Sequence, residues 1–527
     1  MAVATAQMPS PSPPPDVRAI LQGRRAVLVR KRVVQPRTLE LSGTRIGLNL
    51  YGTFHSWHDG DEDRYDQVLG VRLERIVRIG NREYIVNSTG NVRQLTGWLA
   101  QRQVTEDFIN SDAFENQPQY STALGRAQLD GRNVVQLRVA PPGGAVETVS
   151  LDAATLMIDR ISFVDGDGLE TDDFRDYRVV DRALIPFTEI DSDGEHRYDS
   201  AQRVVAVRVN KPISAKVFAT PQNSTIRTNS PVTVPLEFHD GHYYAAVSIH
   251  GKTLRFLIDT GAQGVVIDSR AASQLTLVPQ GLLEVRGARR VSAVGVAALD
   301  SVSIGGADLP LGEVSIIDLN PATPNDPAID GVLGYPFFAS AEVRLDFGAL
   351  TMTFGKPGSL PTLGERLDVD TDRESAEVPV KIDGVPATCF VDTGNSNELL
   401  IFNPFVQTHP GLIAYAGTSP VSSYGVGGSM SAIAVTVNEL DLGSYQLFNR
   451  SADVMQVDTG AFADRIDAGN IGLGVLRNFV ATFDLANRAM YLQPSPAFDD
   501  GRTRPTAPPQ GSQRSPGSPR SFQETWR

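Results

Sequence analysis

The sequence of 527 residues contains a single cysteine, Cys389. One cysteine excludes an intramolecular disulfide framework and a multi-cysteine metal site. Its position inside an expected buried strand favours a small core residue over a reactive thiol. Basic residues are also few, because 48 Lys and Arg stand against 61 Asp and Glu and give a net charge of −13. This acid excess excludes the basic surface of a nucleic-acid-binding protein.

Long apolar runs are absent as well. No run approaches the roughly 18 residues that a membrane-spanning helix requires, so we expect no membrane span. The N-terminus lacks a charged segment followed by an apolar one, and an intact secretion signal is not expected. Residues 2–7 resemble the small-residue end of such a signal. A periplasmic or secreted location is favoured if the start is truncated, and a cytoplasmic one otherwise.

The length predicts two or more domains in a mainly β protein. Alternating apolar residues at 134–139 and 148–151 predict strands, and the apolar spacing within residues 91–114 predicts a helix. The clustered His and Asp residues at 55–61 lack a third anchor at a recognised spacing, so a polar loop is expected there instead of a metal site. We expect a lead-in (1–15), an N-terminal antiparallel β domain (16–221), a linker (222–231), a first lobe (232–356), a connector (357–375), a second lobe (376–494) and a disordered tail (495–527).

The two lobes are expected because one sequence pattern occurs twice. An apolar strand ends in Asp259-Thr260-Gly261, and a second ends in Asp392-Thr393-Gly394, 133 residues later. Each copy is followed by a short apolar element closed by glycine, at 331–334 and at 470–474, and then by a strand-turn-strand. Such a repeat predicts a tandem duplication of an all-β unit.

A third triplet, Asp458-Thr459-Gly460, tests whether the motif is over-interpreted. Asp458 precedes Gly474 by 16 residues, and Asp318 precedes Gly334 by the same 16. The corresponding place in the first lobe therefore holds no triplet. Because polar sequence follows Gly460, we expect a loop without a catalytic role.

Paired Asp-Thr-Gly motifs with apolar-apolar-Gly elements resemble the aspartic proteases of the retropepsin and pepsin clan. Ala262 after the first triplet is closer to the retropepsin pattern, and the block length is similar to two tandem retropepsin-like lobes of the bacterial type. Asn395 after the second triplet departs from both patterns. The N-terminal region resembles, in strand order alone, the half-barrels of periplasmic lipoprotein carriers.

The resemblance implies a two-lobed acid-protease β-barrel fold and an aspartic endopeptidase. Asp259 and Asp392 would activate a water molecule against a peptide bond, with no metal and no cofactor. Two carboxylates that share one proton present a base and an acid together, and the two titrations belong to the pair. From the residues alone, neither aspartate is assigned as the base.

The other candidate residues support this pair. Thr260 and Thr393 would bond across the two loops, while Gly261 and Gly394 allow close approach of the backbone. By the resemblance, Leu333, Gly334, Leu473 and Gly474 lie behind the loops. Substrate-binding flaps are expected near Gly295 and in the glycine-rich stretch that holds Tyr424, Gly425, Gly427 and Gly428.

The histidines, among them His239, His242, His250 and His409, are expected on turns and at the surface. The predicted partner is a polypeptide substrate, and a monomer is expected because both lobes lie in one chain. The alternative function is a catalytically silent protease fold whose N-terminal domain holds a lipid or protein ligand. Cleavage of only the protein's own linker or tail is a third hypothesis.

Overall fold

The structure is a computed structural model, and it describes residues 16–47, 50–166, 168–194, 196, 198–286, 291–319, 328–412, 419–425 and 428–503. The chain forms two compact units. Unit 1 holds Met1–Pro36, Gln101–Phe163 and Thr171–Asp191, and unit 2 holds Arg37–Ala100, Val164–Glu170 and Ser192–Arg527. The predicted N-terminal domain, 16–221, is thus divided between the units, because residues 37–100 group with the two lobes.

Unit 1 is a meander packed against helices. Its strands follow the order β12-β11-β10-β9-β8-β7, so each strand neighbours the next in sequence. The runs predicted as strands form β8 and β9. Leu137, Val149 and Phe163 pack with Leu21 and Phe114 of the helices in one core. The elements are α1 (Val17–Arg30), α2 (Trp98–Asn110, its first residues in unit 2), α3 (Ala113–Asn116), η1 (Pro118–Tyr120), β7 (Ser121–Leu129), β8 (Arg132–Val139), β9 (Glu147–Asp152), β10 (Ile158–Asp165), β11 (Gly168–Val180) and β12 (Ala183–Ser192).

Unit 2 begins with another run of antiparallel strands, in the order β6-β5-β4-β3-β2-β1-β13. Leu50 and Leu69 of this sheet pack against Val296 of the first lobe. The elements are β1 (Thr38–Gly47), β2 (Leu50–Asp59), β3 (Glu62–Leu69), β4 (Arg72–Ile79), β5 (Arg82–Val86), β6 (Val92–Gln94), β13 (Ser200–Val209) and η2 (Ala215–Phe218).

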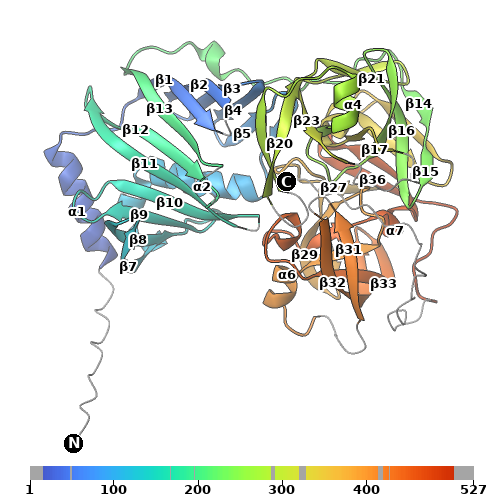
Figure 1. Cartoon of the computed structure of the whole chain (residues 1–527). Helices are drawn as coiled ribbons and strands as arrows, with labels where there is room; N and C mark the ends of the chain where they lie inside the picture. The colour runs from blue at the N-terminus through green and yellow to red at the C-terminus, as the bar shows by residue number, and fades with distance from the viewer. Residues whose placement is uncertain are drawn as a thin grey trace, which may run out of the picture. The chain divides into compact units, whose positions relative to one another are not determined.

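The two lobes repeat one strand arrangement, coloured green to yellow for lobe 1 and orange to red for lobe 2 in Figure 1. In lobe 1 the sheet order includes β16-β17-β24-β18-β23-β20-β19, and in lobe 2 it is β28-β29-β34-β30-β33-β32-β31. The parallel and antiparallel pairings match strand for strand along this path. The predicted duplication is therefore present in the fold. In lobe 2 a further pairing of β28 with β32 closes the sheet into a barrel.

The elements of lobe 1 are β14 (Val232–Pro235), β15 (Glu237–His239), β16 (His242–Ile249), β17 (Lys252–Ile258), β18 (Val265–Asp268), α4 (Ser269–Gln274), β19 (Gly281–Arg286), β20 (Val291–Ala298), β21 (Ser301–Ile304), β22 (Ala307–Pro310), β23 (Glu313–Ile317), β24 (Gly331–Leu333), α5 (Tyr335–Ser340), β25 (Glu342–Asp346) and β26 (Thr351–Gly355). Those of lobe 2 are β27 (Glu365–Asp368), β28 (Glu377–Ile382), β29 (Val385–Val391), β30 (Leu399–Phe402), α6 (Asn403–Thr408), β31 (Ser419–Gly425), β32 (Gly428–Leu442), β33 (Tyr445–Met455), η3 (Ala461–Ala463), β34 (Gly469–Ile471), α7 (Leu473–Leu476), β35 (Phe479–Asp484), η4 (Leu485–Asn487) and β36 (Ala489–Pro494).

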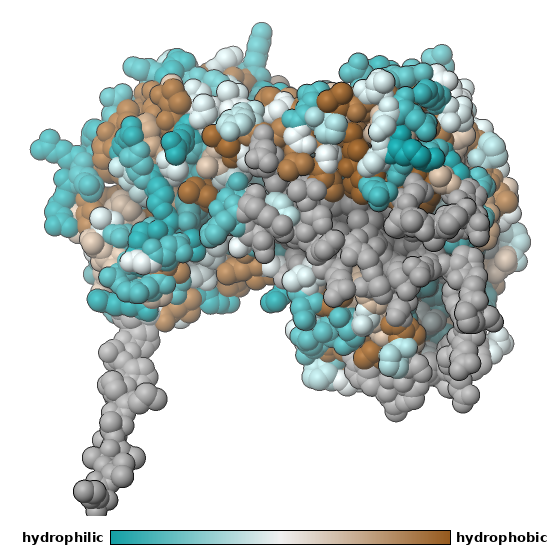
Figure 2. All heavy atoms as spheres, viewed as in Figure 1, coloured by the Kyte–Doolittle hydropathy of each residue, from teal (hydrophilic) through white to brown (hydrophobic). Residues whose placement is uncertain are grey.

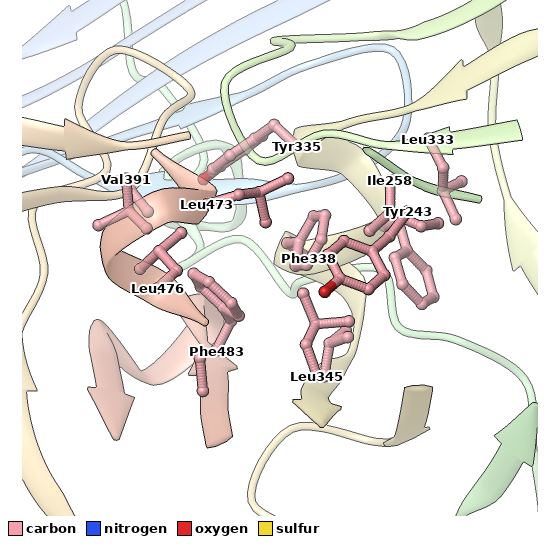
Figure 3. Packing of buried hydrophobic residues seen from close by; sticks show 14 of the residues in the cluster. Tyr243, Ile258, Leu333, Tyr335, Phe338, Leu345, Val391, Leu473, Leu476 and Phe483 are labelled. Carbon is pink, nitrogen blue, oxygen red and sulfur yellow. The ribbon is translucent and has the colours of Figure 1, made fainter. Parts of the chain in front are cut away.

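A six-stranded sheet joins the lobes, in the order β14-β26-β25-β35-β36-β27. Three strands come from each lobe, and β25 pairs antiparallel with β35 at the junction. Figure 3 shows the core beside this junction, where Leu473 of lobe 2 lies near Phe338 of lobe 1. The rings of Phe338 and Phe483 meet edge to face with centroids 5.4 Å apart. The lobes therefore share one hydrophobic core, which fixes their mutual position.

Residues 495–503 differ from the expected disordered tail. The ring of Phe498 lies 5.4 Å from that of Phe479, and the backbone N–H of Phe448 donates to the carbonyl of Asp500 at 2.6 Å. This segment therefore packs on lobe 2.

Hydrophobic side chains also occur at the surface, with Tyr51 and Val205 more than 70% exposed (74% and 72%). Figure 2 shows hydrophobic residues in several separate groups among hydrophilic ones, which is ordinary for protein surfaces. Among the described residues, no helix has the length and apolar character to cross a membrane.

Candidate active site

Asp259 and Asp392 each directly follow a buried strand. β17 ends at Ile258 and β29 at Val391, and both aspartates are almost fully buried. The backbone N–H of Asp259 donates to the carbonyl of Leu333 at 3.2 Å, and that of Asp392 donates to the carbonyl of Ile471 at 2.9 Å. Each loop is thus anchored to the short parallel strand behind it.

Backbone donors orient each carboxylate in the same way. The Gly261 N–H donates to Asp259 Oδ1 at 2.8 Å, and the Gly394 N–H donates to Asp392 Oδ1 at 2.9 Å. Hydrogen bonds from N–H groups favour the ionised form of a carboxylate. The two loops therefore present their carboxylates in matching orientations.

The threonines of the two triplets join the loops. Each threonine N–H donates to the other threonine's Oγ1 at 3.0 Å. Each hydroxyl in turn donates across the interface, Thr260 to the Val391 carbonyl at 2.6 Å and Thr393 to the Ile258 carbonyl at 2.8 Å. Four buried hydrogen bonds thus tie the ends of β17 and β29 together.

The glycines let the carboxylates meet. A Cβ atom built on Gly261 would lie 2.7 Å from Asp392 Oδ1, and one built on Gly394 would lie 2.5 Å from Asp259 Oδ2. Each carboxylate therefore lies against the glycine of the opposite triplet, in space that a side chain would fill. Two buried carboxylates brought together in this way do not both ionise easily.

The predicted support residues of lobe 2 require a correction. In lobe 1, Ile258 pairs with Leu333, and Gly334 follows as the residue before α5. In lobe 2, Val391 pairs with Ile471, and Gly472 precedes α7. The equivalents of Leu333 and Gly334 are thus Ile471 and Gly472, not Leu473 and Gly474.

The close contacts of the glycines agree with this register. A Cβ atom on Gly334 would lie 2.4 Å from the Ala262 carbonyl oxygen, and one on Gly472 would lie 2.7 Å from the side chain of Asn395. Both glycines thus back the residue after their triplet. Leu473 instead begins α7, and Gly474 packs against Glu398.

Asn470 was missed by sequence reasoning. It lies on β34 opposite Phe390, where lobe 1 has Val332 opposite Leu257. Its Nδ2 donates to Asp392 Oδ2 at 2.8 Å, and its Oδ1 accepts from Asn395 Nδ2 at 2.6 Å. A polar residue in an otherwise apolar three-residue strand is the signal that could have identified it.

The prediction for His242 is wrong. The sequence predicts a turn at the surface, but His242 is 1% exposed. Its Nε2 lies 3.0 Å from the carbonyl of Gly394, and its Nδ1 lies 2.9 Å from the carbonyl of Asp240. The loop of lobe 2 that covers it comes from 152 residues later, and a local sequence pattern carries no sign of that contact.

The remaining candidates are placed as follows. Burial raises the pKa of the Cys389 thiol well above its ordinary value, which makes a nucleophilic role unfavourable. Asp458 is exposed and lies in a bend after β33. The sequence comparison placed Asp318 and Asp458 at the same distance from equivalent glycines, Gly334 and Gly474. Because Gly472 is the true equivalent of Gly334, that comparison does not hold. The exposure of Asp458 still agrees with a loop.

Both predicted flap regions contain hairpins. Gly295 lies within β20, paired with Leu282 of β19. In lobe 2, Tyr424 pairs with Ser429, and Gly425 pairs with Gly428 at the end of the β31–β32 hairpin. Gly427 lies outside the described residues. The flap assignments remain predictions.

A comparison with models of protein families finds a match in each lobe. A family model described as aspartyl protease matches residues 245–337 and 378–475. The two matched regions contain the two triplets, one in each lobe. No curated protein matches the sequence.

Among solved structures, two similar chains come from Desulfovibrio piger and Vibrio parahaemolyticus. One is a DUF1329 family protein from Desulfovibrio piger, with 14% identity and a TM-score of 0.27, covering 38% of this chain and 97% of that chain. The other is a domain described as an outer membrane lipoprotein-sorting protein from Vibrio parahaemolyticus, with 15% identity and a TM-score of 0.25, covering 38% of this chain and 95% of that chain. These scores are too low to support a functional conclusion.

Proposed function

We propose that this protein is an aspartic endopeptidase that hydrolyses peptide bonds with a water molecule activated by Asp259 and Asp392. The observation that carries the proposal is the reciprocal arrangement of the two triplets, in which each aspartate lies against the glycine of the other. The aspartyl protease match to both lobes supports it.

The chemistry follows from the pair. Hydrolysis of an amide needs a base that takes a proton from water, an acid that protonates the carbonyl oxygen, and a proton for the leaving amine. One ionised and one protonated carboxyl group supply both roles at once. When the tetrahedral intermediate collapses, the base gives its proton to the leaving amine and the carbon–nitrogen bond breaks. The hydroxyl formed from the carbonyl oxygen returns its proton to the acid, so one turnover restores the starting state.

The proposed substrate is a polypeptide, and the catalytic region acts as two fused retropepsin-like lobes in one chain. Two homologous lobes supply one aspartate each, so a single chain carries a whole dyad. A monomer therefore suffices for activity. The hairpins β19–β20 and β31–β32 are the proposed substrate-covering segments. The glycine-rich sequence at the end of the β31–β32 hairpin suits a movable cover.

The test is cleavage of an unfolded protein, followed by mass spectrometry of the peptides. We expect the wild type to cleave it and Asp259→Asn to lose activity by a factor on the order of 10³ or more. The matched control is Asp458→Asn. It makes the same change in the third Asp-Thr-Gly triplet, at an exposed position. This control should retain wild-type activity.

A peptide inhibitor that mimics the tetrahedral intermediate, such as pepstatin, adds an independent readout. It should block the wild type in proportion to occupancy. Binding of unfolded protein without any cleavage, unchanged in Asp259→Asn, would instead support the catalytically silent binding module. Shortened forms of the protein itself, without cleavage of added substrate, would support self-processing alone.

A further inference from the structure

The surroundings of the two aspartates are not symmetric. The lobes share strand order and loop geometry, but two positions next to the dyad differ in chemistry. Ala262 follows the first triplet and Val332 lies on the strand behind it, whereas the equivalent positions of lobe 2 hold Asn395 and Asn470. The side chains of Ala and Val have no hydrogen-bond donor, and those of both asparagines do.

The two asparagines form a directed chain of hydrogen bonds that ends on Asp392. The backbone N–H of Asn397 donates to Asn395 Oδ1 at 2.9 Å. Asn395 Nδ2 then donates to Asn470 Oδ1 at 2.6 Å, and Asn470 Nδ2 donates to Asp392 Oδ2 at 2.8 Å. Because a backbone N–H can only donate, it fixes the orientation of the first amide, and each amide then fixes the next.

Burial strengthens this chain. Both asparagines are fully buried at 0% exposed, so neither amide exchanges its partner for bulk water. Hydrogen bonds are stronger in such low-dielectric surroundings, and a donor to a charged acceptor contributes more than a donor to a neutral one. The chain thus favours the ionised form of Asp392 over its neutral form.

We propose that Asn470 is a positioning residue that holds Asp392 as the ionised member of the pair, so that Asp259 carries the shared proton in the free enzyme. Asp392 is then the base that takes a proton from the water molecule. Asp259 is the acid that protonates the substrate carbonyl oxygen. This inference rests on the proposed peptidase function and assigns the two roles within it.

Other titratable groups also face this loop. Asp259 lies against Gly394 from lobe 1. His242 at the start of β16 contacts the Gly394 carbonyl. Asp453 on β33 accepts a hydrogen bond from Asn397 Nδ2 at 3.1 Å. The test therefore changes only the uncharged donor and leaves these three groups in place.

The experiment is the pH profile of kcat/KM for Asn470→Val. Lobe 1 carries Val332 at the same strand position, which makes valine the matched substitution. The acid limb of the profile reports the ionisation of the base in the free enzyme. We expect this limb to move to higher pH by about one unit or more, the size of a hydrogen bond to a charged group.

The control is Asn91→Val, which removes a buried amide hydrogen bond of the same length, 2.8 Å, to Ser340. It should leave the acid limb in place even where it lowers stability. If Asn470→Val does not fold, Asn395→Ala replaces it, with Ala262 as its precedent, and should move the limb in the same direction by less.

The possible results distinguish the assignment of Asp392 as the base from the peptidase function itself. An active Asn470→Val enzyme with an unchanged acid limb would overturn the assignment of Asp392 and leave the peptidase proposal standing. A wild type that cleaves no unfolded protein at any pH would overturn both. A displaced limb in Asn470→Val alone, with Asn91→Val unchanged, is the result that the inference requires.

Discussion

Thr260 and Thr393 each donate a backbone N–H to the other's hydroxyl across the lobe interface, at 3.0 Å in both directions. Each hydroxyl is also a donor to a carbonyl of the opposite strand end. The aspartates that precede these threonines are thus held by the same four bonds that tie the ends of β17 and β29 together. A change in Thr260 or Thr393 should therefore alter both the positions of the two aspartates and the stability of the interface between the lobes.

Replacing Thr260 with valine should therefore be strongly destabilising. The change keeps the shape but leaves the Thr393 N–H and the Val391 carbonyl without their hydroxyl partner in a buried site, which costs about 2–4 kcal/mol. Thr260→Ser retains the hydroxyl and should lose about 1 kcal/mol or less. Denaturant unfolding measures both free energies. Equal losses in the two variants would show that the hydroxyl has no part in holding the loops.

The segment that follows β6 should be required for the stability of the two lobes. Asp372, between the lobes, accepts the backbone N–H groups of Thr96 at 2.8 Å and Gly97 at 2.7 Å. The carbonyl of the next residue, Arg373, accepts a hydrogen bond from Gln263 Nε2 at 2.7 Å. Gln263 lies four residues after Asp259 in the sequence. These contacts connect residues of the N-terminal half of the chain to the loop beside the active site.

We expect Asp372→Ala to lower the free energy of unfolding by about 1–3 kcal/mol, since two partly buried backbone N–H groups lose the acceptor that the buried Asp372 side chain supplies. Asp372→Asn keeps an acceptor oxygen and should lose less. Asp368→Ala, at an exposed position beside Arg366, is the control and should stay within about 0.5 kcal/mol of wild type. A loss in Asp368→Ala equal to that in Asp372→Ala would contradict the role of the two N–H groups.

The buried carboxyl group of Glu147 in unit 1 should stabilise the fold most in acid. Burial, with a smaller contribution from the Glu106 charge, raises the pKa of Glu147 from 4.5 to about 8. The folded state therefore keeps a proton that the unfolded chain releases above its ordinary pKa. The contribution of Glu147 to stability is fully present below about pH 4.5, is lost as pH rises to about 8, and is then constant.

Glu147→Gln removes this titration. Its unfolding free energy should match the wild type near the acid end and exceed it by roughly 3–5 kcal/mol near pH 8. Unfolding curves in guanidinium at a series of pH values measure the difference. A gap between variant and wild type that does not grow with pH would refute the buried neutral carboxyl.

Much of the catalytic region was predictable from the sequence, for a local reason. Apolar strands that end in Asp-Thr-Gly carry their own signal, and the repeat at 133 residues identified two equivalent copies. The strand-turn-strand that ends each copy became β25–β26 and β35–β36. These features depend on residues close together in the chain.

The errors arose where distant residues decide. Two glycines two residues apart, Gly472 and Gly474, fit the same pattern, and only the pairing of Val391 with Ile471 distinguishes them. The burial of His242 depends on a loop of the other lobe.

The central claim is that Asp259 and Asp392 act as one unit. The most direct measurement is kcat/KM for Asp259→Asn, Asp392→Asn and the double variant, under conditions where all three remain folded. We predict that each single variant loses about as much activity as the double, because removing either carboxyl disables the whole pair. A single variant within about tenfold of wild type, or single losses that multiply in the double variant, would contradict the account.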